Sequence, residues 1–332
     1  MSETSWSRER LLEVMNGFRP ACLLGAAAEL DLWTQLGEVA LTAQQLAQRL
    51  GCDLRALTML LDALAALHLL DKREDVYSVP LAIRAWLTAG APQTVLPMLQ
   101  HSMNTLRGWS QLAWVAKCGM PFPRPASIRG PIADRESFIA AMHAVSGPVA
   151  DELVGRLGPP PFRRMLDVGG ASGTWTLAFL RARPTASAVI FDLPDAIHLA
   201  RQRLADSPFA ERVELVAGDF YRDDLPGSVD FAWVSAICHQ HSRAENRTLF
   251  AKVCAALLSG GRIAVRDVVM EPCRTKPLHG AMFALNMLVN TERGGTFTFD
   301  EYTTDLEAAG FVRPRLVIKD EAMNSVIIAE KA

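Results

Sequence analysis

The stretch Met165-Leu-Asp-Val-Gly-Gly-Ala-Ser-Gly173 decides the fold of this chain. It reads as a short buried strand, 165–168, that runs into a glycine turn and then into a helix over 174–183. Glycine supplies the unusual backbone angles of such a turn, and its missing side chain lets a ligand approach the backbone. In a doubly wound α/β sheet, a turn of this kind lies where a nucleotide-like ligand binds. Alone it is a weak signal, because glycine turns also join strands to helices for structural reasons.

Acidic residues stand at the ends of three successive predicted strands. Asp167 ends the first, where its carboxylate could bind a cationic amino group. The second strand, 188–191, runs into Asp192-Leu-Pro, and an acid there is placed to accept hydrogen bonds from ribose hydroxyls. The third, 213–216, is followed by Gly218-Asp219-Phe220, an acid and an aromatic ring. Together they predict one polar ligand with an adenosine part, although acids also cap α/β helices by chance.

The turn does not have the features of a phosphate-binding loop. It lacks the Gly-Lys-Ser/Thr ending of a P-loop, and no lysine lies nearby in the sequence. An acid directly before the glycines would repel a pyrophosphate. S-adenosylmethionine is therefore favoured over NAD as the ligand.

Composition limits the class of protein. With 332 residues, 50% of them hydrophobic, the chain can bury two cores and is expected to form about two domains. A formal net charge of -2 gives no general attraction to nucleic acid or to an anionic membrane. No signal peptide or membrane span is predicted, because charged residues interrupt every long apolar run. The 6 scattered cysteines contain no C-x-x-C pair and read as reduced thiols of a cytoplasmic protein.

The N-terminal part has the element order of a winged helix. Apolar residues of 6–36 fall at helical spacing, with a new helix expected to begin at Pro20. Thr42-Ala-Gln-Gln45 is a capping-box pattern that opens a helix to Leu50, and Asp53 caps another over 54–67. Two short β segments, 69–70 and 76–77, flank a polar turn at 71–75.

Winged helices often bind DNA through their second helix, which then needs side chains for phosphates and base edges. Here the second helix carries only Arg55, Thr58 and Asp62 among alanines and leucines, so it is built to be buried. The charge pattern disfavours DNA binding and also a regulator that would sense a nucleoside. We interpret this region as a packing and dimerisation module.

Three regions follow from these patterns. The winged-helix domain is expected over 1–90, a helical linker broken by the proline-rich stretch 119–125 over 91–157, and the α/β domain over 158–332. The predicted fold class is α/β, a Rossmann-like doubly wound sheet domain preceded by an all-α winged-helix domain. Further elements of the α/β domain are expected as strands 231–237 and 262–269, helices 243–258 and 278–291, a helix capped by Asp300 and ending at Gly310, and a strand pair at 311–319 and 324–330.

A histidine follows the fourth strand, at the edge where such sheets bind ligands. His239 can act as a general base near neutral pH, and Asp267 at the end of the neighbouring strand can orient its imidazole. Cys238 and His241 allow a metal site, but no further Cys/His pair at ligand spacing completes it, and no metal is expected.

The sequence resembles the class I S-adenosylmethionine-dependent O-methyltransferases of the plant caffeic-acid type and their bacterial natural-product relatives. The resemblance covers nearly the whole chain. It is carried by five segments taken together: Leu166-Asp-Val-Gly-Gly-Ala-Ser-Gly173, Phe191-Asp-Leu-Pro194, Gly218-Asp-Phe220, Ile237-Cys-His-Gln-His-Ser242 and Leu306-Glu-Ala-Ala-Gly-Phe311.

This resemblance implies roles for named residues. His239 matches the catalytic base and Asp267 one of two acids that flank it, Asp192 would hold the ribose, and Asp219 with Phe220 the adenine. The remaining cofactor positions are Asp167, Gly169, Gly170, Gly173, Leu193 and Ser235, and the acceptor pocket would be lined by Phe138, Met142, Met287, Asn290 and Thr291. The N-terminal domain would form a homodimer.

Two departures from the family pattern stand beside the base. His239-Gln240-His241 replaces the usual His-Asp-Trp, and Thr296 stands where the second flanking acid, a glutamate, is expected. The function predicted is methylation of a hydroxyl on a small aromatic or polyketide-like molecule, with His239 removing the proton. The alternatives are C- or N-methylation, or a homologue that binds the cofactor and performs hydroxylation, decarboxylation or a pericyclic reaction.

Overall fold

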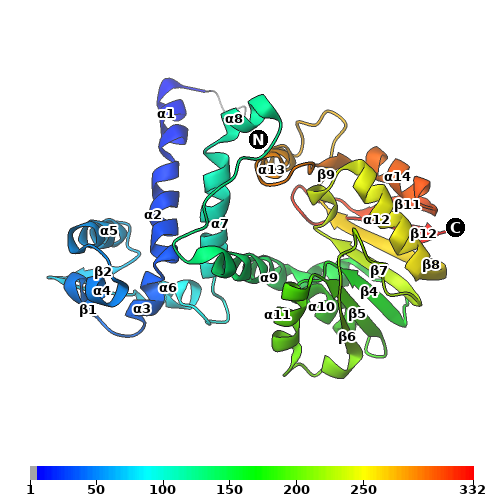
Figure 1. Ribbon diagram of the computed structural model, residues 1–332, viewed down its shortest axis with the longest axis horizontal. Helices are drawn as coiled ribbons and strands as arrows, with labels where there is room; N and C mark the ends of the chain where they lie inside the picture. The colour runs from blue at the N-terminus through cyan, green and yellow to red at the C-terminus, as the bar shows by residue number, and fades with distance from the viewer. Residues whose placement is uncertain (1–5) are drawn as a thin grey trace. The chain divides into compact units, whose positions relative to one another are not determined.

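A computed structural model describes residues 6–332 of the chain (Figure 1). The chain divides into two compact units. Within the described residues the first comprises 6–107 with 124–144, and the second 108–123 with 145–332. The helical segment 91–157 is divided between the two units. The three domains expected from the sequence stay a prediction.

The first unit is mostly helical. Its sheet has the order β1-β3-β2, formed by β1 (Leu41–Thr42), β2 (Asp71–Arg73) and β3 (Val76–Ser78). Its helices are α1 (Arg8–Asn16), α2 (Phe18–Glu29), α3 (Leu32–Leu36), α4 (Ala43–Leu50), α5 (Leu54–Ala66) and α6 (Leu81–Leu87). Two further helices, α7 (Leu96–Trp109) and α9 (Gly130–Leu157), begin in this unit and end in the second.

The predicted caps of the winged helix are present. Thr42 and Gln45 form a reciprocal capping box at the start of α4, and the Asp53 side chain accepts a hydrogen bond from the Ala56 backbone at the start of α5. Leu57, Leu61 and Leu64 of α5 are buried in the core of the unit. The second helix of the winged-helix pattern is thus a packing helix, as its composition indicated.

Two sequence-based boundaries in this unit were wrong. The first β segment is Asp71–Arg73 and not 69–70, because the Leu69 N–H bonds back to the Leu64 carbonyl at the end of α5. Helix α2 begins at Phe18 and not at Pro20. A proline in the first turn removes an N–H that has no partner within the helix, so it does not force the helix to begin there.

The second unit is built on a seven-stranded sheet of order β11-β12-β8-β7-β4-β5-β6 (Figure 1). The strands are β4 (Arg164–Val168), β5 (Ser187–Asp192), β6 (Val213–Ala217), β7 (Val229–Ser235), β8 (Leu257–Asp267), β11 (Phe311–Ile318) and β12 (Ser325–Lys331). Strands β4 to β8 are parallel, and β12 pairs antiparallel with both β8 and β11. The carboxyl ends of the five parallel strands therefore lie along one edge of the sheet.

Helices pack on both faces of this sheet. Alternate residues of β7 and β8 enter two different cores, one with α12 (Arg243–Ala256) and α14 (Phe299–Ala308), the other with α9 and α10 (Thr174–Ala182). The unit also contains α8 (Leu112–Cys118), α11 (Pro194–Leu204), α13 (Leu278–Asn290), the short helices η1 (Ala210–Arg212) and η2 (Cys238–Gln240), and a two-stranded ribbon of β9 (Val269–Met270) and β10 (Phe297–Thr298). Coverage of both faces is the doubly wound α/β arrangement that was predicted.

The structure moves the start of α14, the end of β7 and both ends of β8. Helix α14 is capped by Thr298, in a reciprocal capping box with Glu301, and not by Asp300. Strand β7 ends at Ser235, because Ala236 has a φ of 58°, outside the β region. Strand β8 begins already at Leu257 and ends at Asp267, and Val269 pairs with Phe297 in the small ribbon instead.

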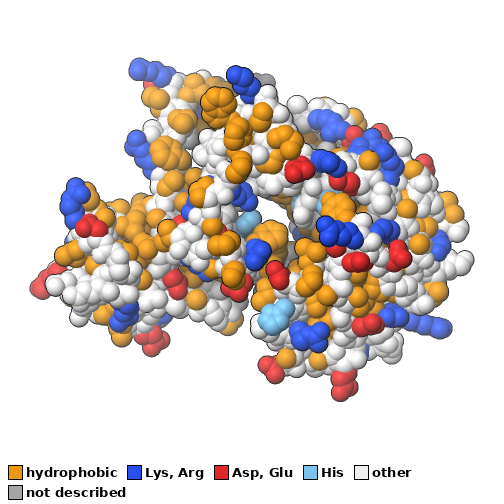
Figure 2. Space-filling model, viewed as in Figure 1, with side chains coloured by type: hydrophobic (Ala, Val, Ile, Leu, Met, Phe, Trp, Pro, Cys, Tyr) orange, Lys and Arg blue, Asp and Glu red, His pale blue; other side chains and the backbone are white. Residues whose placement is uncertain are grey.

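Exposed apolar side chains gather on the first helix of the chain. None of the residues of α1 is buried, and Leu11, Met15 and Phe18 are each more than half exposed at spacings of one and two helical turns. Figure 2 shows hydrophobic side chains on the surface of α1 and the start of α2. Among the described residues, no helix is long and apolar enough to cross a membrane.

Candidate active site

The glycine turn has the backbone conformation that its sequence predicted. Gly169 and Gly173 have φ of 67° and 76°, in the left-handed region that favours glycine. A Cβ on Gly170 would lie 2.8 Å from Asp167 Cγ, so the turn is also too tight for a side chain there. Helix α11 holds the turn through Arg203, whose Nη1 donates to the Ser172 carbonyl over 2.9 Å, a contact that the sequence did not indicate.

Asp192, at the end of β5, joins the glycine turn to the next helix. Its Oδ2 accepts the Ala171 N–H over 2.7 Å and its Oδ1 accepts the Leu193 N–H over 2.7 Å. Each carboxylate oxygen keeps a lone pair for a further donor. Burial raises the pKa of Asp192. Leu193 is 54% exposed beside it.

Asp167 points into the interior of the unit. Its residue is 1% exposed, and its Oδ2 accepts the Thr176 hydroxyl over 2.6 Å. Burial, and secondarily the charge of Asp192, raises the pKa of Asp167 to about 7. The carboxylate therefore supports the glycine turn from the interior, through its bond to α10. Its contact with a cofactor amino group stays a prediction.

The loop after β6 carries an acid and a ring at the same edge. Asp219 Oδ1 accepts the Tyr221 N–H over 2.9 Å, while the ammonium group of Lys252 on α12 donates to the Phe220 carbonyl over 2.7 Å. The Phe220 ring packs edge-on against His241, with centroids 5.4 Å apart. Asp192 and Asp219 are thus brought to adjacent strand ends, as predicted, with an aromatic ring beside them.

His239 and Asp267 form a buried pair. His239 lies in η2 directly after β7, and its Nδ1 is 2.8 Å from Asp267 Oδ1 at the end of β8. The Asp267 carboxylate also accepts the His239 N–H over 3.1 Å and the Val268 N–H over 2.8 Å, so it is fixed in place. Both residues are less than a tenth exposed. The predicted orientation of the imidazole by Asp267 is present in the structure.

The residues that depart from the family pattern point away from this pair. Gln240 is exposed and donates to the Ala236 carbonyl over 3.2 Å. His241 is buried and contacts the Tyr221 hydroxyl through Nδ1, and burial lowers its pKa. Burial raises the pKa of Cys238 well above its usual range. Within residues 6–332, no three His, Cys, Asp or Glu side chains gather as metal ligands.

Thr296 is buried, with its hydroxyl 3.5 Å from the Gly280 carbonyl. The segment before it contacts His239 directly, since the Gly295 N–H donates to the His239 carbonyl over 2.9 Å. A Cβ on Gly294 would lie 2.5 Å from that carbonyl oxygen. The Gly294-Gly295 pair is therefore part of the support of the loop that carries His239.

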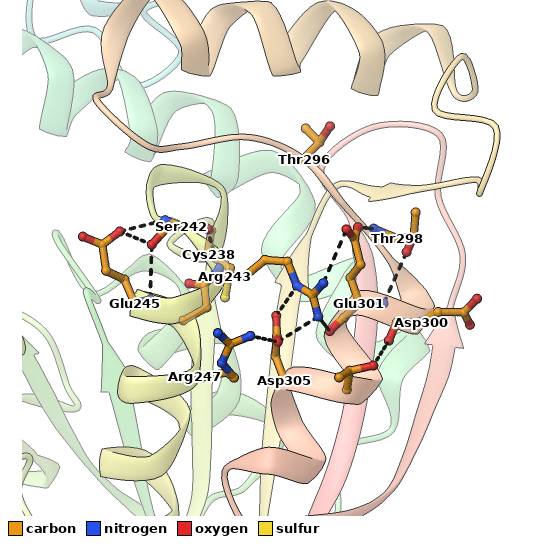
Figure 3. A network of polar contacts seen from close by, with 12 residues as sticks. Cys238, Ser242, Arg243, Glu245, Arg247, Thr296, Thr298, Asp300, Glu301 and Asp305 are labelled. Atoms are coloured by element: carbon orange, nitrogen blue, oxygen red, sulfur yellow. Dashed lines mark hydrogen bonds and ion pairs between the residues drawn. The ribbon is translucent and has the colours of Figure 1, made fainter. Parts of the chain in front are cut away.

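A network of charged side chains ties the helices on either side of this support (Figure 3). Asp305 of α14, 2% exposed, accepts two hydrogen bonds of 2.9 Å from Arg243 and one of 2.9 Å from Arg247, both on α12. Arg274 donates to the Thr296 carbonyl over 3.0 Å and pairs with Glu301 over 2.5 Å. Helix α12 follows the segment with His239 and α14 follows Thr296, so the network fixes both segments.

The predicted acceptor-lining residues lie in different units. Phe138 and Met142 are on α9 in the first unit, and the Phe138 ring packs on His101 with centroids 5.1 Å apart. In the second unit Met287 is buried on α13, Asn290 donates to the Asn286 carbonyl, and the Thr291 hydroxyl donates to the Met287 carbonyl. Their role in binding an acceptor stays a prediction.

Phe283 of α13 was missed from the sequence. Its ring stands edge-on to the His239 imidazole, with centroids 4.8 Å apart. Met287, expected to line the acceptor pocket, is four residues further along α13 and so lies on the same helix face. This spacing is the one signal in the sequence that could have indicated Phe283.

Two family models match the chain. An O-methyltransferase domain matches residues 104–312, and an O-methyltransferase dimerisation domain matches residues 12–86. The first match alone covers more than half of the chain. The protein belongs to the O-methyltransferase family.

Similar proteins cover most or all of this chain. A 3-hydroxy-5-methyl-1-naphthoate 3-O-methyltransferase of Streptomyces sahachiroi is 30% identical over 328 residues, 97% of this chain and 95% of its own. The N,N-dimethyltransferase OxyT of Streptomyces rimosus is 28% identical over 311 residues, 91% of this chain and 90% of its own. The crystal structure of human N-acetylserotonin methyltransferase in complex with S-adenosylmethionine has a TM-score of 0.79 at 25% identity and covers 100% of both chains.

The enzyme is an S-adenosylmethionine-dependent methyltransferase, and its sheet edge suits that cofactor. The edge offers a tight glycine turn, carboxylates at two adjacent strand ends and the Phe220 ring, which match an amino acid, a ribose and an adenine. Asp192, Asp219, Phe220 and the glycine turn would hold it. When bound, it supplies a methyl group activated on a sulfonium.

Proposed function

We propose that this enzyme methylates a hydroxyl group of a small aromatic or polyketide-like molecule, with His239 as the general base. The observation that supports it is the buried His239–Asp267 pair. Because Asp267 occupies Nδ1, the free imidazole nitrogen, Nε2, is the one available to take a proton. A carboxylate in this place also stabilises the imidazolium that forms when the proton is taken.

The rest of the site would hold the acceptor and exclude water. A phenol has a pKa near 10, so a base that removes its proton in the transition state contributes about a hundred-fold or more in rate. Phe283, whose ring edge meets the imidazole, would offer an apolar wall to a flat acceptor. The naphthoate methyltransferase relative supports an aromatic acceptor. Met287 and Asn290 on the same helix, with Thr291 directly after it, would contribute further acceptor contacts.

His239→Ala tests the base directly. We expect the variant to lose turnover with phenolic acceptors by about a hundred-fold or more, because no other group would take the proton. Its affinity for S-adenosylhomocysteine, measured by calorimetric titration, should stay within twofold of the wild type. His198→Ala is the matched control, since His198 is exposed on α11 and its side chain forms a hydrogen bond with Gln202 on the same helix. Undiminished turnover in His239→Ala would show that His239 is not the general base.

A second candidate is methylation of an amino group, favoured by the similarity to OxyT. An amine is nucleophilic without proton removal in its neutral form, so it depends less on a base than a phenol does. Paired naphthol and naphthylamine acceptors, assayed with the wild type and His239→Ala, distinguish the two candidates. Hydroxyl methylation predicts turnover of the naphthol and its loss in the variant.

We also propose that the enzyme is a homodimer that associates through its N-terminal helices. The match to the O-methyltransferase dimerisation domain over residues 12–86 supports this, and so do the exposed apolar side chains of α1.

A further inference from the structure

Arg266, which no sequence pattern singled out, is a buried cation at the end of β8. Its residue is 4% exposed. Its Nε and one Nη donate to Asn324 Oδ1 over 3.0 and 2.6 Å, and its other Nη donates to Ser235 Oγ over 3.1 Å. The guanidinium also lies over the Trp175 ring, 4.4 Å from its centroid. All three partners are neutral.

The charge of this guanidinium has no close counter-ion. Within residues 6–332, no carboxylate forms an ion pair with Arg266, and the two that act on it through space are Asp267 and Asp320. Asp267 is bound to His239, and Asp320 accepts the Ala322 N–H. Burial lowers the pKa of Arg266 to about 10, which leaves it charged at neutral pH. A buried charge without a counter-ion is costly. A buried arginine that forms no ion pair therefore points to an anion supplied by a ligand.

Arg266 lies directly beside the cofactor edge of the sheet. It pairs in register with Ser235, the last residue of β7. Strand β7 adjoins β4, where Val234 pairs with Val168, so Ser235 and Gly169 are the next residues along neighbouring strands. Trp175, on which the guanidinium rests, is the second residue of the helix that follows the glycine turn. The three contacts of Arg266 therefore support the turn, the end of β7 and the loop before β12.

The Ser235 hydroxyl has a defined direction because of this contact. An arginine N–H can only donate, so the Ser235 oxygen accepts from it and the hydroxyl proton is left to point elsewhere. Ser235 is partly exposed, whereas Arg266 is not. The pair thus presents a polarised donor at the surface of the edge, with a positive charge behind it. The only anionic group of S-adenosylmethionine is the carboxylate of its methionine part.

We propose that Arg266 is a positioning residue for the cofactor, which orients and polarises the Ser235 hydroxyl to donate to the methionine carboxylate of S-adenosylmethionine. The proposal concerns cofactor binding, so it does not depend on which acceptor atom is methylated. It makes the cofactor carboxylate the counter-ion that the buried guanidinium lacks.

The test compares two ligands that differ only in this carboxylate. Calorimetric titration of the full chain would measure dissociation constants for S-adenosylmethionine and for decarboxylated S-adenosylmethionine. The wild type should bind the first more tightly, and this preference should fall about tenfold or more in Arg266→Met and in Ser235→Ala, as expected for losing a hydrogen bond to a charged group. The double variant should lose no more than twofold beyond either single variant, because both remove one interaction.

Arg262→Met is the matched control. Arg262 lies on the same strand and pairs with Glu330 over 3.3 Å, and its variant should keep the wild-type preference. If Arg266→Met does not fold, Ser235→Ala alone carries the test. Equal weakening of both ligands would make Arg266 a purely structural support of the turn and overturn the proposal, as would an unchanged preference. A wild type that binds neither ligand would instead contradict the cofactor assignment itself.

Discussion

Three carboxylates stand at neighbouring strand ends, and their surroundings give them different chemistry. Asp219 lies in an open loop, Asp192 accepts two backbone N–H groups, and Asp167 is enclosed against Thr176. The residue type and its place in the sequence are alike in all three. Only the packing of α10 against β4 decides that Asp167 faces inward, which is why sequence reasoning grouped it with the other two.

The enclosure of Asp167 predicts a pH dependence of stability. Its carboxyl has an ordinary pKa of 3.8 in the unfolded chain and about 7 in the folded one. Between these values the folded state binds the extra proton, so this group lowers the free energy of unfolding as pH rises from about 4 to 7. Asp167→Asn keeps an acceptor for Thr176 and removes the charge. We expect it to gain stability over the wild type with rising pH, by at most about 4 kcal/mol at pH 8.

Urea unfolding at pH 5, 6, 7 and 8 measures this difference. Asp206→Asn, on an exposed residue after α11, is the control and should follow the wild type at every pH. A constant difference between Asp167→Asn and the wild type across this range would mean that Asp167 is ionised throughout.

The two adjacent glycines before Thr296 predict opposite outcomes for the same substitution. A Cβ on Gly294 would lie 2.4 Å from Thr291 Oγ1 and 2.5 Å from the His239 carbonyl oxygen, whereas one on Gly295 meets nothing within 4 Å. Gly294→Ala should therefore displace His239. If His239 is the base as proposed, kcat should fall by about tenfold or more, since small misplacements of catalytic groups are costly. Gly295→Ala keeps its N–H and should retain wild-type kcat in the same assay. Similar kcat values for the two variants would show that the close contact of Gly294 with the His239 carbonyl does not affect catalysis.

At the scale of elements, the site depends on how α12 and α14 are held together. The Asp305 carboxylate is shared by two arginines of α12, as Figure 3 shows, and the guanidiniums are a third or more exposed. Removal of one partner of a fully buried pair costs about 3–5 kcal/mol. Because water still reaches both arginines here, we expect Asp305→Asn to lower the free energy of unfolding by about 2 kcal/mol.

Thermal and urea unfolding of the full chain would measure this loss. Asp300→Asn, an exposed position on the same helix, should change stability by about 0.5 kcal/mol or less. Equal effects of the two substitutions would show that the shared carboxylate contributes no more than an exposed charge does.

Elements were easier to predict than their ends. The strands of the sheet alternate with helices of regular period, so their order and type follow from hydrophobic pattern alone. The start of α14 was misplaced because Thr298 and Asp300 are both good caps, and only the reciprocal bond to Glu301 decides between them. Contacts such as Arg266 with Ser235, or Gly295 with His239, join strands or loops distant in sequence, and no local pattern encodes them.

At the scale of the whole molecule, the apolar side chains of α1 predict a partner. Leu11, Met15 and Phe18 form an exposed apolar stripe, and the charged Glu13 forms an ion pair with Arg10. Leu11→Glu combined with Met15→Glu should convert a dimer into a monomer, because two charges would have to be buried at the interface. Sedimentation velocity would measure the mass. Glu13→Gln is the control and should stay dimeric.

The division of the chain into units has a consequence for its synthesis. The polypeptide passes from one unit to the other after residues 107, 123 and 144. A ribosome that has made the first 107 residues has not yet delivered the start of α9, which the N-terminal unit requires. Residues 108–123 are made next, but they belong to the second unit, whose sheet is complete only when its last strand, β12, has been translated. The N-terminal unit can therefore be completed only after residue 144 has been made, and the second unit only after β12. A gene fragment that stops at the predicted boundary after residue 90 encodes no complete unit.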